Sequence, residues 1–321
     1  VLLITIVKKS LRFFKLRLEI LSNAIDIAVK DSCNKAITVA FSGGIDSTLV
    51  AFLAKKYSDV ELIAVGTPKS HDLEAAKTAA EMIEMDLTII EIEPKEMVIE
   101  GFNMQKEINL KAIEVEFMLP FWIAAKNSKN SILMCGQGAD ELFGGYARFR
   151  KEGIVNDLSK EVDDLNKRLK NREKKITEIF DLELSCPYLS ENVVEAANSF
   201  SEEERIGDVG KVPLRQAAQK LGLPKEIANR KKKAAQYGSG SQKAIRDIIK
   251  HKIELEIVFD SNIIAKSVAK STEPENIGWV ETNVVDNKIK AIIKAENLGS
   301  LREATEDFMA CVSVAEKVTK Q

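Results

Sequence analysis

Residues 39–48 read VAFSGGIDST, and here the chain places glycines and hydroxyl groups where a hydrophobic run ends. After Phe41 the backbone must turn, and Gly43 and Gly44 permit positive φ and let backbone N–H groups approach a ligand closely. A helix that begins near Asp46 adds the partial positive charge of its N-terminus. Further hydrogen-bond donors are the hydroxyls of Ser42, Ser47 and Thr48. Together these features predict a site for phosphate or pyrophosphate.

Asp46 stands beside this anion site, where like charges make it a poor ligand for phosphate itself. Its position therefore indicates a bridging Mg²⁺, which prefers hard oxygen ligands. A second acidic pair, Asp140 and Glu141, occurs in CGQGADELFGGYARF at residues 135–149, again after an apolar run. Because the carboxyl ends of parallel strands meet at one edge of a sheet, we expect Asp46 and Asp140 to share the metal. The plainer interpretation is that both stretches are ordinary helix starts with acidic residues near their N-termini.

Strand and helix signals alternate around these two motifs. Apolar runs bounded by turn residues predict strands at AITVAF (36–41), VELIAVG (60–66), DLTIIEIE (86–93) and SILMCG (131–136). Helical spacing of apolar residues separates these runs, and an amphipathic helix is expected from Ser10 to about Lys30. This alternation predicts an α/β fold, in which a parallel sheet is covered by helices on both faces.

The carboxyl-terminal part of the chain follows a different pattern. IELEIVFD (253–260) alternates like a strand, SNIIAKSVAKS (261–271) is typical of a short helix, and apolar runs on either side of Asp286 and Asn287 indicate a hairpin. A long amphipathic helix over 300–320 completes a small β-α-β-β-α unit. We therefore expect a helical lead-in over 1–35, a main domain over 36–250 and a small α+β domain over 251–321.

Composition narrows the class of protein. With 47 basic and 49 acidic side chains, the formal net charge of -2 gives no overall attraction to nucleic acid or to an anionic membrane. The opening run VLLITIVKKS is too short and too soon interrupted by charges to span a bilayer, so no membrane association is expected. The cysteines form no CxxC pair, which indicates neither a zinc site nor a disulfide framework and fits a cytoplasmic protein. They are Cys33, Cys135, Cys186 and Cys311.

The glycine turn resembles the PP-loop of the ATP pyrophosphatases, whose SGGxDS motif is matched by Ser42 to Ser47. The Walker A pattern GxxxxGK followed by Ser or Thr is absent. The resemblance implies that ATP and Mg²⁺ are the cofactors and that the loop holds the β and γ phosphates. It also implies attack on the α-phosphate, so that an adenylate forms and pyrophosphate leaves.

The motif GQGADELFGGY at 136–146, placed after such a loop, is similar to the synthetase domain of asparagine synthetase and of its relative β-lactam synthetase. Two further stretches support the similarity, LSCPYLSENVVEAANS (184–199) and KVPLRQAAQKLGLPKEIANRKKKAAQYGSGS (211–241). It covers roughly residues 36 to 245 and implies an adenine nucleotide alpha hydrolase-like fold. In this family Lys232 would neutralise the phosphoryl transition state. Nucleotide contacts would come from Ser42, Gly43, Gly44, Asp46, Ser47, Val65, Gly66 and Gly136.

Three departures from the family pattern concern the second substrate. Gln137 stands where asparagine synthetase has a glutamate, and a neutral amide cannot act as a general base, although it can orient a substrate amine or carboxylate. Glu116 stands where the family has a phosphate-binding arginine. No cysteine precedes Cys33, so we expect the chain to use free ammonia, a separate glutaminase or another nucleophile rather than an N-terminal cysteine of its own.

The carboxyl-terminal unit resembles the small dimerising subunit of the KEOPS complex, which modifies tRNA. The stretch that carries the resemblance is Ser300, Leu301, Arg302 and Ala304 with the helix that follows. It implies a homodimer and contact with tRNA or a KEOPS-like partner, whereas the simpler interpretation is a generic α+β appendage.

Three functions stay open from the sequence. The first is an amide ligase that adenylates a carboxylate such as aspartate for attack by ammonia. In the second, the same ATP chemistry acts on a base carbonyl in tRNA. In the third, the chain binds nucleotide without turnover and serves as a regulatory protein.

Overall fold

The structure is a computed structural model that describes residues 2–150, 157–230, 238–248, 251–276, 280–295 and 298–319. The chain divides into two compact units, Val1–Gln242 and Lys243–Gln321. Within the described residues, no helix has a stretch both long and apolar enough to cross a lipid bilayer.

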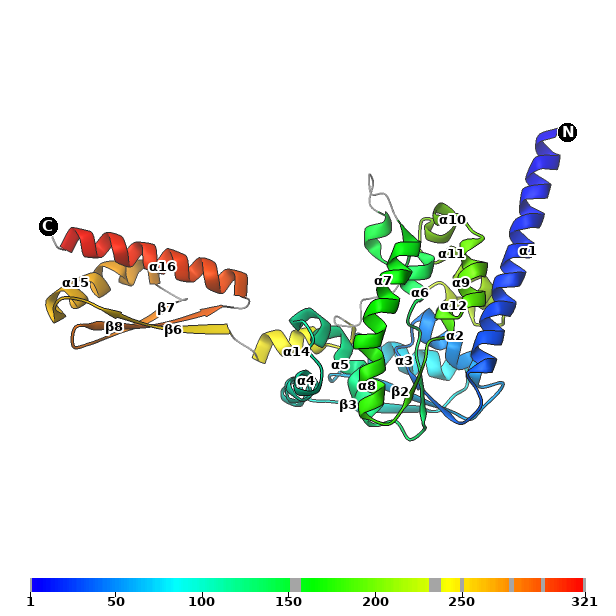
Figure 1. Cartoon of the computed structure of the whole chain (residues 1–321), viewed down its shortest axis with the longest axis horizontal. Coiled ribbons are helices and arrows are strands. Elements are labelled where there is room, and N and C mark those ends of the chain that lie inside the picture. Colours follow the sequence, from blue (N-terminus) through cyan, green and yellow to red (C-terminus); the bar gives the residue numbers. More distant parts are fainter. Residues whose placement is uncertain are drawn as a thin grey trace. The chain divides into compact units, whose positions relative to one another are not determined.

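The larger unit, in which Figure 1 labels β2 and β3, contains a sheet of parallel strands. The sheet has five strands in the order β3-β2-β1-β4-β5. The strands are β1 (Ile37–Ala40), β2 (Val60–Gly66), β3 (Leu87–Glu91), β4 (Ile132–Met134) and β5 (Glu183–Ser185). β1 lies at the centre, with Val39 opposite Leu62 of β2 and Met134 of β4. The prediction of a parallel α/β sheet is therefore confirmed, and β5 is a strand that the sequence did not indicate.

Helices cover both faces of this sheet because the chain reverses direction within it. After β3 the chain returns past β1 to β4, so the right-handed crossover on that side places its helices on the opposite face. The helices of this unit are α1 (Leu2–Asp31), α2 (Ile45–Ala54), α3 (His71–Met82), α4 (Pro94–Glu107), α5 (Ala112–Lys126), α6 (Ala139–Phe143), α7 (Leu158–Asn171), α8 (Glu173–Ile179), α9 (Glu191–Asn198), α10 (Glu202–Ile206), α11 (Val212–Lys220) and α12 (Lys225–Ala228). The helix α14 (Ser241–Ile248) contains the boundary between the two units. Single 3₁₀ turns are η1 (Ala147–Arg150) and η2 (Pro187–Leu189). The reversal between β1 and β4 creates the crevice in which open α/β sheets bind ligands.

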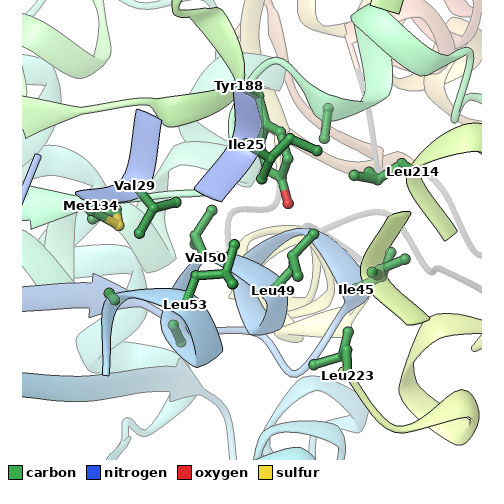
Figure 2. Close-up of a cluster of buried hydrophobic side chains, with 14 of the residues drawn as sticks. Ile25, Val29, Ile45, Leu49, Val50, Leu53, Met134, Tyr188, Leu214 and Leu223 are labelled. Atoms are coloured by element: carbon green, nitrogen blue, oxygen red, sulfur yellow. The ribbon is translucent and has the colours of Figure 1, made fainter. Parts of the chain in front are cut away.

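The core of the larger unit fixes α2, the helix that follows the glycine turn. Leu49, Val50 and Leu53 of α2 pack against Ile25 and Val29 of α1, as Figure 2 shows. Further core residues in the same view are Ile45, Met134, Tyr188, Leu214 and Leu223. α1 contains the amphipathic helix expected over 10–30, and its inner face holds α2 in place. The turn before α2 is thus attached to a rigid element.

The smaller unit is a three-stranded antiparallel sheet with two helices. Its elements are β6 (His251–Val258), α15 (Asn262–Thr272), η3 (Glu273–Asn276), β7 (Val280–Val285), β8 (Lys288–Ala295) and α16 (Leu298–Thr319), and the strand order is β6-β8-β7. Phe259, Val268, Ile293 and Phe308 belong to a core of its own. Asp286 has a positive φ of 53° at the hairpin between β7 and β8, where the sequence predicted a turn. The β-α-β-β-α pattern is confirmed, while the KEOPS-like role and the homodimer stay predictions.

Candidate active site

The turn between β1 and α2 has the geometry of an anion-binding loop. Gly43 has φ of +69°, and a Cβ at this position would lie 2.3 Å from the carbonyl oxygen of Ala75, so only glycine fits. Gly44 precedes α2 with extended backbone. The backbone N–H of Ser42 donates to Oγ of Ser47 at 3.2 Å, which closes the loop over the helix N-terminus. Free N–H groups and the helix dipole therefore face the crevice, as a phosphate site requires.

The turn after β4 lies directly beside this loop. A Cβ on Gly136 would come within 2.7 Å of Cβ of Asp46, so the two turns are in van der Waals contact. Gly138 has φ of +93° and leads into α6, which carries Asp140 in its first turn. Because β1 and β4 are neighbouring strands, their carboxyl ends bring two acidic residues far apart in the sequence to one place.

Asp46 and Asp140 meet at the ammonium group of Lys211. Nζ of Lys211 lies 2.7 and 2.6 Å from Oδ1 and Oδ2 of Asp46, and 2.6 Å from Oδ1 of Asp140. All three side chains are buried, with Lys211 only 2% exposed. Lys211 has a positive φ of 59°, its N–H donates to the carbonyl of Phe143, and the Tyr188 hydroxyl donates to the carbonyl of Asp46. The expected convergence of the two carboxylates is present, and a lysine supplies the cation between them.

This arrangement fits Mg²⁺. Magnesium is bound in nucleotide sites by one or two carboxylates together with phosphate oxygens and water. Asp46 and Asp140 provide two carboxylates that already converge on one cation. No third acidic residue, histidine or cysteine joins them among the residues that the structure describes, which leaves the remaining positions to ligand oxygens and water.

A pocket of about 180 Å³ opens beside these loops. Of the residues predicted to bind substrate or cofactor, those that line it are Ser42, Asp46, Ser47, Val65, Gly136, Gln137 and Asp140. Its apolar wall includes Ile63, Phe117 and Pro120. Gly43, Gly44 and Gly66 lie in the adjoining turns and do not line it. Lys232 lies outside the described residues. The pocket thus joins a phosphate-binding end to an apolar wall suited to a base.

Gln137 is held by a buried ion pair. Its Nε2 donates to Oε1 of Glu173 at 2.7 Å, and Glu173 is completely buried. Arg172 donates to both oxygens of Glu173, at 2.9 and 2.6 Å, and lies 3.7 Å from Glu114. Burial acts to lower the pKa of Arg172, but hydrogen bonds and attraction from Glu173, with Glu114 and Glu141 adding to them, raise it overall. The guanidinium is therefore permanently charged.

Glu116 is part of the structural frame rather than the pocket lining. Its carboxylate accepts a hydrogen bond of 2.8 Å from Nε2 of Gln242, and its backbone carbonyl accepts one from the Ser241 hydroxyl. The following residue, Phe117, does line the pocket. Glu116 thus ties α5 to the first two residues of α14.

Two cysteines that look isolated in the sequence lie close together. Sγ of Cys135 is 3.6 Å from Sγ of Cys186, because the two residues follow the neighbouring parallel strands β4 and β5. The hydrogen bond with Cys135 and burial raise the pKa of the Cys186 thiol well above its usual range. Both are thiols, and the pair lies at the edge of the pocket that Cys135 lines.

Sequence reasoning missed three residues of this site. Lys211 opens the stretch KVPLRQAA, and its place at the head of that family-like pattern is the signal that could have identified it. Arg172 and Glu173 lie in the charged run NREKK, where nothing distinguishes them from residues of a solvated helix.

The fold and the two loops define an α/β domain of the PP-loop type. The profile described as Asparagine synthase matches residues 19–174 and 158–292. A Methanocaldococcus jannaschii protein that carries the provisional name glutamine-hydrolysing asparagine synthetase 1 is 33% identical, over 70% of this chain and 51% of its own length. The glutamine-hydrolysing asparagine synthetase of Brassica oleracea is 29% identical, over 63% of this chain and 39% of its own. The chain belongs to the asparagine synthase family.

The chain spans about half the length, or less, of the curated relatives it matches. Among solved structures, NMN synthetase from Francisella tularensis matches 64% of this chain and 94% of its own, with 17% identity and a TM-score of 0.31.

Proposed function

We propose that this chain is an ATP-dependent amide ligase that adenylates a carboxylate, with aspartate as the first candidate, for attack by ammonia. The observation that carries the proposal is the convergence of Asp46 and Asp140 beside a glycine turn at the N-terminus of α2. Membership of the asparagine synthase family supports the same chemistry.

In this proposal the loop from Ser42 to Ser47 binds the pyrophosphate portion of ATP through backbone N–H groups and hydroxyls. Val65, Gly66 and Gly136 contact the rest of the nucleotide. Asp46 and Asp140 hold Mg²⁺, and when bound the metal neutralises phosphate charge as pyrophosphate departs. In the absence of metal, the Lys211 ammonium lies between the two carboxylates and pairs with both. The resemblance to the asparagine synthetase family adds Lys232 as the cation that offsets charge on the reacting phosphoryl group.

The reaction has two steps that balance. A carboxylate oxygen of the substrate attacks the α-phosphorus of ATP, the bond to the β-phosphate oxygen breaks, and pyrophosphate leaves. Ammonia then attacks the activated carbonyl carbon, loses a proton, and expels AMP to leave an amide. The ammonia is free or comes from a separate glutaminase.

The test is a product screen with ATP radiolabelled at the α-phosphate, incubated with Mg²⁺, ammonium and single amino acids, and separately with tRNA. AMP formed only with a carboxylate and ammonium supports the proposal. Formation of ADP overturns it. AMP formed only with tRNA favours a tRNA-modifying enzyme, for which the carboxyl-terminal unit would be the candidate tRNA or partner contact. ATP binding without any product favours a regulatory protein.

A pair of variants separates site chemistry from general damage. Asp46→Asn removes a metal-binding charge and should abolish AMP formation. Asp164→Asn changes an exposed carboxylate that pairs with Lys167 on α7, and it should leave AMP formation unchanged. Equal activity in both variants would show that Asp46 has no part in the chemistry.

A further inference from the structure

The side-chain amide of Gln137 has a fixed direction. An amide has one end that donates hydrogen bonds and one that accepts them, and a carboxylate can bind only the donating end. Because Nε2 of Gln137 donates to Oε1 of Glu173, the amino end points at the buried carboxylate. Gln137 lines the pocket and Glu173 does not. The carbonyl oxygen lies at the other end of the amide and is the acceptor that Gln137 can offer to a ligand.

The partner that fixes this direction cannot turn away. Glu173 is completely buried, and Arg172 binds both of its oxygens. The guanidinium carbon of Arg172 lies 5.0 Å from the centroid of the Phe117 ring, and Phe117 is itself part of the pocket wall. Breaking this pair would leave a buried charge without its partner, which is strongly unfavourable. Gln137 therefore meets a rigid acceptor in every bound state.

Charge around this corner of the pocket is negative. Three carboxylates, those of Glu114, Glu141 and Glu173, act on the single guanidinium of Arg172. The hydroxyl of Tyr146 donates to Glu141 at 2.7 Å but adds no charge. A ligand group that faces the Gln137 carbonyl should accordingly be a hydrogen-bond donor and a cation, since a carboxylate there would be repelled by the carbonyl oxygen and by the nearby carboxylates.

We propose that Arg172 and Glu173 are positioning residues that hold the Gln137 carbonyl toward the pocket, so that the site selects an ammonium group at this point. The inference rests on the proposed function and specifies the chemistry of its second substrate. The ammonium group has two sources, the α-ammonium of an amino-acid substrate or the ammonium ion that supplies the nucleophile. The amide carbonyl of Gln137 thus selects a hydrogen-bond donor on the ligand, although the amide cannot act as a general base.

The test exchanges the two partners. Glu173→Gln removes the carboxylate and frees the Gln137 amide to turn, whereas Gln137→Glu sets two carboxylates against each other. The double variant Gln137→Glu with Glu173→Gln again has one amide and one carboxylate, with their positions exchanged. Its carboxylate at position 137 again presents a hydrogen-bond acceptor to the pocket. Gln137→Ala removes that acceptor while leaving the Arg172–Glu173 pair intact. Glu178→Gln, an exposed change on the same helix, is the control.

Binding is measured by calorimetry with a non-hydrolysable ATP analogue and Mg²⁺ present. The probes are L-aspartate, succinate, which lacks the ammonium group, and ammonium chloride with sodium chloride as its blank. Glu173→Gln and Gln137→Ala should weaken the ammonium-bearing probe by about tenfold to a hundredfold, the cost of a lost hydrogen bond to a charged group. The double variant should recover most of this loss, and Glu178→Gln should bind every probe as the wild type does.

The two sources give different results. Loss confined to L-aspartate, with succinate unaffected, identifies the α-ammonium, and loss confined to ammonium chloride identifies the nucleophile. Three results would overturn the inference. The first is that Glu173→Gln binds the ammonium-bearing probe as tightly as the wild type does, and the second is that the wild type shows no ammonium-dependent binding. The third is that the double variant melts like the wild type but recovers none of the lost affinity. Because no turnover is needed, these results are separate from the AMP or ADP outcome that decides the proposed function.

Discussion

Replacing Lys211 by methionine would test the ion cluster at the centre of the site. Methionine matches the length of the lysine stem but leaves the carboxylates of Asp46 and Asp140 buried without their shared cation. Removing one partner of a buried ion pair costs about 3–5 kcal/mol. In a unit of this size that loss corresponds to a melting temperature lower by roughly 10 °C. We expect Lys211→Met to lose stability of this size in the absence of metal.

Urea unfolding followed by circular dichroism measures the change, using the transition of the larger unit. Lys220→Met is the matched control, because Lys220 lies on the helix that follows Lys211 and pairs with Glu19 at 3.6 Å with both side chains largely exposed. A surface pair of this kind contributes about 0–1 kcal/mol. Mg²⁺ should stabilise Lys211→Met more than the wild type, since the vacated carboxylates then bind it without competition.

A loss in Lys211→Met no larger than that in Lys220→Met would refute this reasoning. It would mean that Asp46 and Asp140 do not depend on the lysine for compensation, and that solvent or another group already balances their charge. Equal stabilisation of wild type and variant by Mg²⁺ would separately refute the assignment of the two carboxylates as the metal site.

Three further outcomes are expected. Gly43→Ala should lower the free energy of unfolding by about 2 kcal/mol or more, because φ at this position is positive and the new Cβ would clash with the Ala75 carbonyl. Gly44→Ala is the control in the same melting assay. Its Cβ would meet nothing nearer than 3.5 Å, so it should cost under about 1 kcal/mol. Chelation by EDTA should abolish AMP formation without lowering the melting temperature of the nucleotide-free protein, because the Lys211 ammonium already pairs with both carboxylates; a large drop would contradict this. Burial raises the pKa of Cys33 to about 11, so the rate of its alkylation by iodoacetamide should keep rising up to that pH. The stability that the neutral thiol contributes should be lost only as pH rises from 9 to about 11. An alkylation rate that levels off near pH 9 would contradict this.

Much of the fold follows from local patterns in the sequence. β1, β2 and β4 are short apolar runs bounded by turns, and burial on both faces of a parallel sheet requires that composition. The hairpin at Asp286 and Asn287 follows from alternation on both sides of a turn. β5 was missed because its three residues, Glu183 to Ser185, stand next to a charged helical run and pair only through the edge of β4.

The site was partly predictable for a similar reason. Asp46 and Asp140 each stand directly after a recognisable strand, and parallel strands bring such positions together. Lys211 lies 165 residues after Asp46 in the sequence, and no local pattern predicts that the two side chains meet. The ion pair of Arg172 and Glu173 could not be predicted, because a run of charged residues is typical of a solvated helix. Only the tertiary structure shows that these two side chains are buried. Cys135 and Cys186 are neighbours only through the pairing of β4 with the unpredicted β5.

The most direct test of the central claim follows the oxygen atoms of the carboxylate. If the substrate carboxylate attacks the α-phosphorus, aspartate labelled with heavy oxygen in its side-chain carboxylate must transfer one labelled atom to AMP, which mass spectrometry detects. We expect AMP that carries one labelled oxygen and an amide that keeps the other. The pyrophosphate should carry no label. Unlabelled AMP, or ADP and phosphate in place of AMP and pyrophosphate, would contradict the adenylation mechanism.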